Sequence, residues 1–334
     1  MFNINTVLLV CFFTFRFPTA PSMNVIFCYE KLVIREGYGK YKPNEFSECH
    51  ILLHLQQPEQ QASSNAASDI GYQLDREIKI VVGHGMTHVA CTVDLCVLTM
   101  FEGEQCRLQT KRNAAQSAAA DVEYLTLEVT LVSLLAASDL YSTTYKEKLM
   151  RAVILKDLGT SAFTAGNVSA AFHKFSRSLK YLTCATVDND KTGTGHNLLS
   201  NGTTAGDSSH PVLLTDGGVS AQNMCNMTCG DIAQLTCRCW LNLAACQLRY
   251  QNFKMAAVNC SEALEIEPNN VKGLFRRAQC NMKTGCEHTA VTDLEQALAL
   301  EPGNREIKRL LNTARQLTRK NDDKLAAAMS KMFR

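Results

Sequence analysis

Two prolines lie 34 residues apart, Pro268 and Pro302, and the 34 residues leading up to each follow one pattern. Small residues recur at matching places in both copies, and a third, weaker copy lies upstream. They are Ala244, Ala256 and Ala263; Ala278, Ala290 and Ala297; and, upstream, Gly159, Ala171 and Ser178, with Phe175 in the same register. Only Gly, Ala or Ser lets two antiparallel helices approach closely at such points. The pattern therefore predicts stacked helical hairpins.

A 34-residue period with small residues at the eighth, twentieth and twenty-seventh positions is the tetratricopeptide (TPR) pattern. Such hairpins stack into a solenoid whose concave groove binds a peptide and carries out no chemistry. In the first helix of each hairpin, the second, fifth, sixth and ninth positions face the groove. They supply cations and polar groups at Lys156 and Thr160 in repeat one, Asn242 in repeat two, and Lys272 and Arg276 in repeat three.

The runs "ILKDLGTSAF", "CWLNLAACQL" and "VKGLFRRAQC" resemble the TPR domains of the large FK-binding (FKBP) immunophilins. In that family Lys, Asn, Lys and Arg at these positions form a clamp for two carboxylates. The clamp grips the C-terminal Met-Glu-Glu-Val-Asp tail of the ninety-kilodalton heat-shock chaperone. A chain-end Asp offers two carboxylates, so it needs converging cations and an amide donor. The resemblance implies the same clamp here, with Thr160 at a position that is often Asn. The alternative is ordinary solubilising charge on exposed helices.

The chain from Val25 to Leu135 reads as short, β-branched or alternating strands, among them "ECHILLHL", "REIKIVVG", "EQCRLQTK" and "EYLTLEVTLVSLL". Their order resembles the FKBP domain, in which a bent antiparallel sheet wraps one short helix, here about Val89 to Met100. In this resemblance "REGYGKYKPNEFSECHILLHL" corresponds to the entry strands of the domain. The expected fold class is therefore an α+β FKBP-like half followed by an all-α TPR solenoid of three repeats with a C-terminal capping helix.

The FKBP-like half departs from the family at its isomerase pocket. The Trp that forms the pocket floor, at the start of the central helix, is Val93 here, and the chain's single Trp is Trp240. Leu55 stands at the position of an entry-strand Tyr, and two loops that carry aromatic residues have no counterpart. The resemblance thus implies a degenerate pocket at Leu55, Val89, Ala90 and Val93, with no catalytic residues. Without an aromatic floor, packing on the proline of the transition state is lost, so we expect no peptidyl-prolyl isomerase activity.

Composition and periodicity divide the 334 residues into seven segments. They are an apolar N-terminal segment (1–23), the degenerate FKBP-like domain (24–135), a linker helix with the first repeat (136–183), a flexible insertion (184–230), the second repeat (231–268), the third repeat (269–302) and the capping helix (303–334). The apolar run "TVLLVCFFTF" is similar to a secretory signal but has no Lys or Arg ahead of it. We expect it to be an extended gene-model start, with Met23 as the true start.

Composition excludes several function classes. A net charge of +2 does not favour binding to nucleic acid. The C-terminal residues are not an apolar run, so we expect no membrane anchor there. The 15 cysteines are an odd number scattered through helical segments, which favours free thiols over a disulfide scaffold or a metal site. Free thiols fit a cytoplasmic protein, and nuclear localisation is compatible with them as well. No cofactor is expected. Secretion remains the alternative that the N-terminal segment leaves open.

Three functions remain open from sequence. The first is a co-chaperone adaptor that combines the TPR clamp with an inactive FKBP-like half for contact with a client protein, an organisation similar to the FKBP-like (FKBPL) branch of the family. The second is an active peptidyl-prolyl isomerase. The third is a TPR scaffold for a different partner. The pocket substitutions disfavour the second, and the Lys272 and Arg276 pair disfavours the third.

Overall fold

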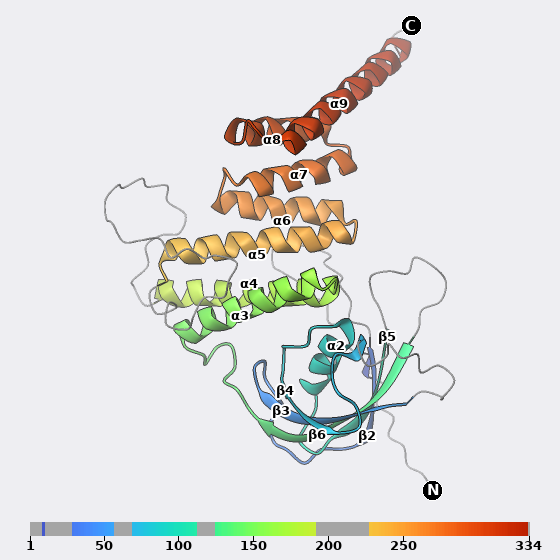
Figure 1. Ribbon diagram of the computed structural model, residues 1–334, viewed down its shortest axis with the longest axis vertical. Coiled ribbons are helices and arrows are strands. Elements are labelled where there is room, and N and C mark those ends of the chain that lie inside the picture. Colours follow the sequence, from blue (N-terminus) through green and yellow to red (C-terminus); the bar gives the residue numbers. More distant parts are fainter. Residues whose placement is uncertain (1–8, 11–28, 57–68, 112–123, 192–226, 333–334) are drawn as a thin grey trace. The chain divides into compact units, whose positions relative to one another are not determined.

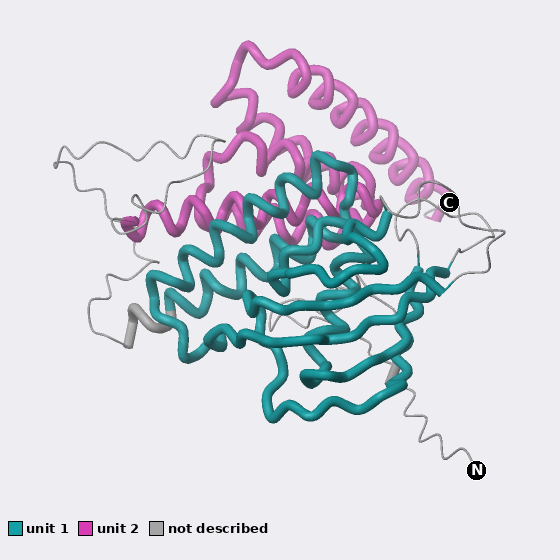
Figure 2. The backbone as a smooth tube through the Cα atoms, turned by 60° about the horizontal axis from the view of Figure 1, so that its bottom comes forward, with its two compact units in different colours: residues 1–195 teal, residues 196–334 magenta. Residues whose placement is uncertain are grey.

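The computed structural model describes residues 9–10, 29–56, 69–111, 124–191 and 227–332. The chain forms two compact units, residues 1–195 and residues 196–334 (Figure 2). Most of the predicted insertion and of the apolar N-terminal segment lies outside the described residues.

The first unit begins with an antiparallel sheet in the strand order β1-β2-β5-β6-β3-β4. Its strands are β1 (Leu9–Val10), β2 (Tyr29–Arg35), β3 (Glu48–Leu55), β4 (Glu77–Val81), β5 (Gln105–Lys111) and β6 (Tyr124–Leu135). Buried and exposed side chains alternate along β5, which is the pattern of a sheet with one covered face. The bent sheet wraps helix α2 (His88–Val97), as Figure 1 shows. The predicted α+β class is confirmed.

Two details of the sheet half differ from the sequence expectation. In the expected entry-strand run, residues 48–55 form β3 and Arg35 ends β2, whereas residues 36–47 form no strand. Gly37 and Gly39 pack closely against Phe101 and Glu102. A Cβ on Gly37 would lie 2.7 Å from the Glu102 carbonyl oxygen, so this stretch runs as a close-packed loop. In addition, α2 begins at His88, where the Thr87 side chain caps the Ala90 amide. Val93 therefore lies in the middle of the helix and not at its start.

Helices α3 (Tyr145–Thr164) and α4 (Val168–Lys191) complete the first unit as a hairpin. They touch at the predicted small residues. A Cβ on Gly159 would lie 2.7 Å from the Phe175 ring, and the Ser178 hydroxyl donates to the Ala152 carbonyl at 2.7 Å. α4 continues through residues 184–191, which composition had placed in the flexible insertion; the first helix-breaking residue is Gly193.

The second unit is a stack of helices, α5 (Cys229–Arg249), α6 (Phe253–Ile266), α7 (Val271–Thr284), α8 (Glu287–Leu300) and α9 (Arg305–Met332). The six alanines that define the second and third repeats are all fully buried between these helices. The first turns of α9 cover the last repeat through Ile307, Leu311 and Ala314, which are buried, whereas residues 319–332 are exposed. The predicted capping helix thus caps with its first half only.

Candidate peptide-binding site

Helix α7 carries two of the predicted clamp residues one turn apart, Lys272 and Arg276. The Asn270 side chain caps the helix by accepting from the Gly273 amide at 3.0 Å. Gly273 lets α7 pack closely, since a Cβ there would lie 3.1 Å from the Leu264 side chain. Lys272 is exposed and Arg276 is half-buried, so the two cations of this helix differ in their access to water.

The Arg276 guanidinium is held without a counter-ion. Its Nη1 donates to the Leu241 carbonyl oxygen at 2.9 Å. Among the described residues, no carboxylate lies within ion-pairing distance of Arg276 or Lys272. Burial lowers the pKa of Arg276 from its ordinary value, but an arginine remains charged at neutral pH.

Three buried thiols surround this guanidinium, one each from α5, α6 and α7. Burial raises the pKa of Cys246 and of Cys260 to about 12, and that of Cys280 to about 11. The thiols are therefore neutral at physiological pH and do not compensate the positive charge. The site holds a preoriented cation that an incoming anion can still engage.

The adjacent arginine, Arg277, does have a carboxylate partner. Arg277 forms a bidentate ion pair with Asp293, with Nε to Oδ2 at 2.9 Å and Nη2 to Oδ1 at 2.7 Å. Asp293 is buried on α8, so this pair links two helices of the third repeat. Of the two neighbouring arginines, Arg277 forms an ion pair that links two helices. Arg276 has no carboxylate partner among the described residues.

The remaining clamp positions lie on first helices of their hairpins. Asn242 is half-buried on α5, directly after the Leu241 residue whose carbonyl holds Arg276. Lys156 and Thr160 lie one turn apart on α3 of the first unit. The Lys156 ammonium contacts the Asp157 carboxylate at 2.5 Å, and the Thr160 hydroxyl donates to the Lys156 carbonyl at 3.0 Å. Asn242, Lys272 and Arg276 thus share the second unit, while Lys156 and Thr160 belong to the first.

Three of the four predicted isomerase-pocket positions are closed to solvent. Val89, Ala90 and Val93 on α2 are fully buried, and Leu55 at the end of β3 is half-buried. Trp240 lies on α5, in the second unit. No aromatic ring replaces the expected floor at these positions.

A buried polar cluster that sequence reasoning missed centres on Asp94 of α2. Its carboxylate accepts from the Gly83 amide at 3.0 Å, the Gly85 amide at 2.8 Å and the Tyr72 hydroxyl at 2.7 Å. Burial raises the pKa of Asp94 above its ordinary value, against the opposing effect of Lys174 on α4. The signal in the sequence was an acidic residue within the largely apolar run "HVACTVDLCV".

Proteins of known family with a similar sequence have the same two-part architecture. No protein-family model matches the chain. It is 26% identical to the peptidyl-prolyl cis-trans isomerase FKBP4 of Bos taurus over 310 residues, which cover 89% of this chain and 56% of that protein. It is 38% identical to the FK506-binding protein-like protein of Mus musculus over 94 residues, 28% of this chain and 27% of that protein. The chain shares the FKBP-like plus TPR organisation of these immunophilins.

The chain spans about half the length of the FKBP4 relatives it matches. A multi-domain immunophilin structure from Arabidopsis thaliana superimposes with a TM-score of 0.33 and 20% identity, covering 80% of this chain and 93% of that one. Within the described residues, no helix is long and apolar enough to cross a membrane. The same residues contain no group of three or more His, Cys, Asp or Glu side chains that could hold a metal ion.

Proposed function

We propose that this protein is a co-chaperone adaptor whose TPR groove binds the acidic C-terminal tail of the ninety-kilodalton heat-shock chaperone. Lys156, Thr160, Asn242, Lys272 and Arg276 form the carboxylate clamp in this proposal. The observation that carries it is the Arg276 guanidinium, which is half-buried, fixed by the Leu241 carbonyl and without a carboxylate partner among the described residues. Burying a cation without a counter-ion is costly, and an anionic ligand would offset that cost.

The ligand chemistry follows from the kind of groups at these positions. Two lysines and an arginine supply charge-assisted donors, and Asn242 supplies an amide donor. A peptide that ends in aspartate offers a side-chain carboxylate and a terminal carboxylate for such donors. The Lys156 ammonium contacts the half-buried Asp157 carboxylate, so a bound peptide would compete with that ion pair.

Titration of a labelled Met-Glu-Glu-Val-Asp peptide into the full chain tests the clamp. We expect saturable one-to-one binding that weakens as salt is raised, because the groove is partly open to solvent and its charges are screened. The same peptide with a C-terminal amide in place of the carboxylate is the matched control and should bind much more weakly. Equal binding of both peptides would contradict a clamp for chain-end carboxylates.

The FKBP-like half is proposed to contact a client or partner and not to catalyse isomerisation. The support is that Val89, Ala90 and Val93 are fully buried and that no Trp lies at the pocket floor. Aromatic contacts contribute about 0.5–1.5 kcal/mol each beyond burial, so losing several removes much of a modest catalyst's transition-state binding.

An X-Pro peptide assay on the full chain is therefore expected to show no acceleration of cis-trans isomerisation. The family's macrolide inhibitors should also fail to bind. An inhibitor-sensitive rate enhancement would overturn this part of the proposal and favour an active isomerase, without bearing on the peptide clamp.

A further inference from the structure

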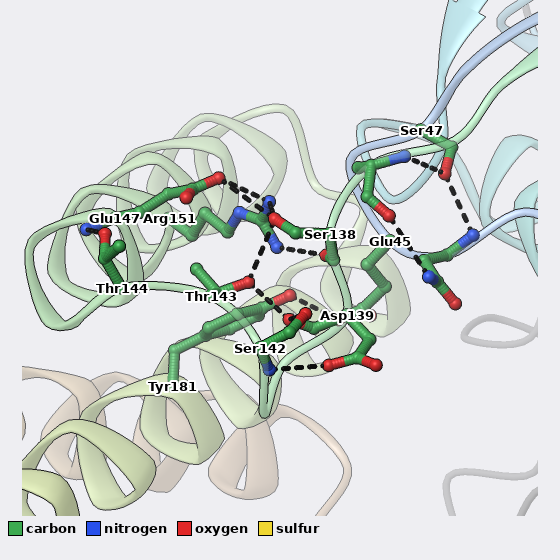
Figure 3. Close-up of polar contacts among 12 residues, drawn as sticks. Glu45, Ser47, Ser138, Asp139, Ser142, Thr143, Thr144, Glu147, Arg151 and Tyr181 are labelled. Carbon is green, nitrogen blue, oxygen red and sulfur yellow. Dashed lines mark hydrogen bonds and ion pairs between the residues drawn. The ribbon is translucent and has the colours of Figure 1, made fainter.

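Among its described residues, the first unit contains a polar cluster built from hydrogen bonds and a separate cluster built from sulfur atoms. In the first cluster, which Figure 3 shows, the Arg151 guanidinium donates to the Ser138 carbonyl at 3.0 Å. The Tyr181 hydroxyl there donates to the Glu45 carboxylate at 3.2 Å. The second cluster lies between α2 and β5 in the core of the sheet half. Its groups are two thiols and a thioether, which are weak in hydrogen bonding but are good ligands for soft metal ions.

The three sulfur atoms come from α2, from the turn after it and from β5. The Cys106 Sγ lies 3.5 Å from the Cys96 Sγ and 3.8 Å from the Met100 Sδ. All three residues are 0% exposed. The Met100 amide donates to the Val97 carbonyl at 3.0 Å, so the chain keeps turning beyond α2 and Met100 follows Cys96 by about one turn. Cys106 lies on the covered face of β5, which faces α2.

The separations between these atoms are closer to those of metal ligands than to a covalent bond. A disulfide requires sulfur atoms about 2 Å apart. A metal–thiolate bond is about 2.3 Å long, so three sulfurs around one ion lie about 4 Å from one another. The distances of 3.5 Å and 3.8 Å approach that value, so a small outward movement would admit an ion. The alternative is that these thiols only pack as small apolar groups.

The types of donor indicate which ion would bind. Thiolate and thioether sulfurs favour Cu(I) over the harder divalent ions. A structural zinc site takes four ligands from Cys, His, Asp or Glu. The described residues contain no group of even three such side chains that could hold a metal ion. The cluster reaches three donors only through the methionine, and a thioether suits a soft monovalent ion.

The charges near the cluster suit a pair of thiolates. Lys31 on β2 is 4% exposed, and its ammonium contacts the Glu104 carboxylate at 2.5 Å and donates to the Thr99 hydroxyl at 3.0 Å. The hydrogen bond with Cys96 and burial raise the pKa of Cys106, whereas the charge of Lys31 lowers it. Cu(I) would displace both thiol protons and leave a complex of net charge −1. The nearby ammonium would attract that complex.

We propose that Cys96, Met100 and Cys106 bind one Cu(I) ion between α2 and β5, in the core of the sheet half. All three ligands belong to the first unit and none is a position of the proposed peptide clamp, so this inference is independent of the proposed function. It departs from the free thiols that composition favours. The reason is that a helical turn and a strand bring these residues together only in the folded chain.

Competition for Cu(I) with bicinchoninate tests the site on the reduced full chain under anaerobic conditions. The chain has 15 cysteines, so the decisive comparison is between variants with equal numbers of thiols. We expect Cys106→Ala to bind one equivalent of Cu(I) fewer than Cys49→Ala. Cys49 is the matched control because it is also 0% exposed in the sheet half, on β3, where it lies opposite Ile80 and Leu134.

Met100→Leu tests the thioether without removing a thiol. Leucine has about the volume of methionine and is apolar, so the variant should fold. An ion that binds the folded chain raises the Tm. We expect Cu(I) to raise the Tm of wild type and of Cys49→Ala, to raise that of Met100→Leu less, and to leave that of Cys106→Ala without this rise.

Three results would overturn the site. The first is equal Cu(I) stoichiometry for Cys106→Ala and Cys49→Ala. The second is a rise in Tm that is as large in Met100→Leu as in wild type, since the thioether would then not be a ligand. The third is a lower Tm in every protein, which would show that the ion binds thiols of the unfolded chain. Circular dichroism reports folding, and Met100→Leu decides the result if Cys106→Ala does not fold.

Discussion

Arg276→Ala is expected to weaken binding of a Met-Glu-Glu-Val-Asp peptide by about 2–4 kcal/mol, roughly 30- to 1,000-fold in Kd. The reason is that Arg276 is a half-buried cation whose guanidinium is already oriented by the Leu241 carbonyl, so little ordering is required when a carboxylate arrives. Lys272→Ala should lose a similar contact, at the lower end of that range, since Lys272 is exposed and better screened. Isothermal titration calorimetry measures both.

Arg277→Ala is the matched control for that experiment. Its guanidinium is engaged by Asp293, so its removal should lower the stability of the third repeat and leave peptide affinity near that of wild type at temperatures where the protein is folded. Peptide affinity that is unchanged in Arg276→Ala, or lost in Arg277→Ala without unfolding, would show that the groove face has been assigned to the wrong arginine.

The stability of the first unit is expected to fall by about 3 kcal/mol between neutral pH and pH 4 through His88 alone. His88 is buried on α2 and contacts the Ser169 hydroxyl at 3.1 Å. Burial, reinforced by the charge of Lys111, lowers the pKa of His88 to about 4 from an ordinary 6.5. Between those values the unfolded chain binds a proton that the folded chain does not. The contribution is therefore complete above pH 6.5 and is lost as the pH falls toward 4.

His88→Gln isolates this contribution, because Gln keeps a polar group near Ser169 but does not titrate. Hydrogen exchange of the β3 and β6 amides reports the free energy of unfolding of the sheet half at each pH. The raised pKa of Asp94 acts in the opposite direction, and His84, whose pKa burial lowers to about 4, acts in the same one. Both remain in the variant, so the wild-type minus variant difference belongs to His88. Parallel pH profiles for the two proteins would refute the assignment.

Much of the architecture was predictable because its signals are local. Small residues at fixed spacing predict the TPR hairpins, and the six alanines that define the second and third repeats are all buried as that spacing predicts. Strands β3, β5 and β6 follow from short alternating runs for the same reason, since a strand's covered face recurs every second residue. The clamp positions are predicted from the register of the repeats and remain a proposal. The same register assigns Arg276, and not the neighbouring Arg277, to the groove.

The sequence alone predicted the two architectures and the candidate groove positions. It could do so because the periodic patterns of helices and strands lie in residues that are close together in the chain. Only the tertiary structure decided what the polar face of α4 does. No sequence pattern singled out Lys174 or Tyr181. In the structure Lys174 contacts Gly83, 91 residues earlier, and Tyr181 contacts Glu45, 136 residues earlier. The sheet half also decided that Val93 lies mid-helix, since α2 starts where Thr87 caps it. A contact between residues so far apart leaves no periodic trace in the chain, so its partners become visible only when the halves are folded together.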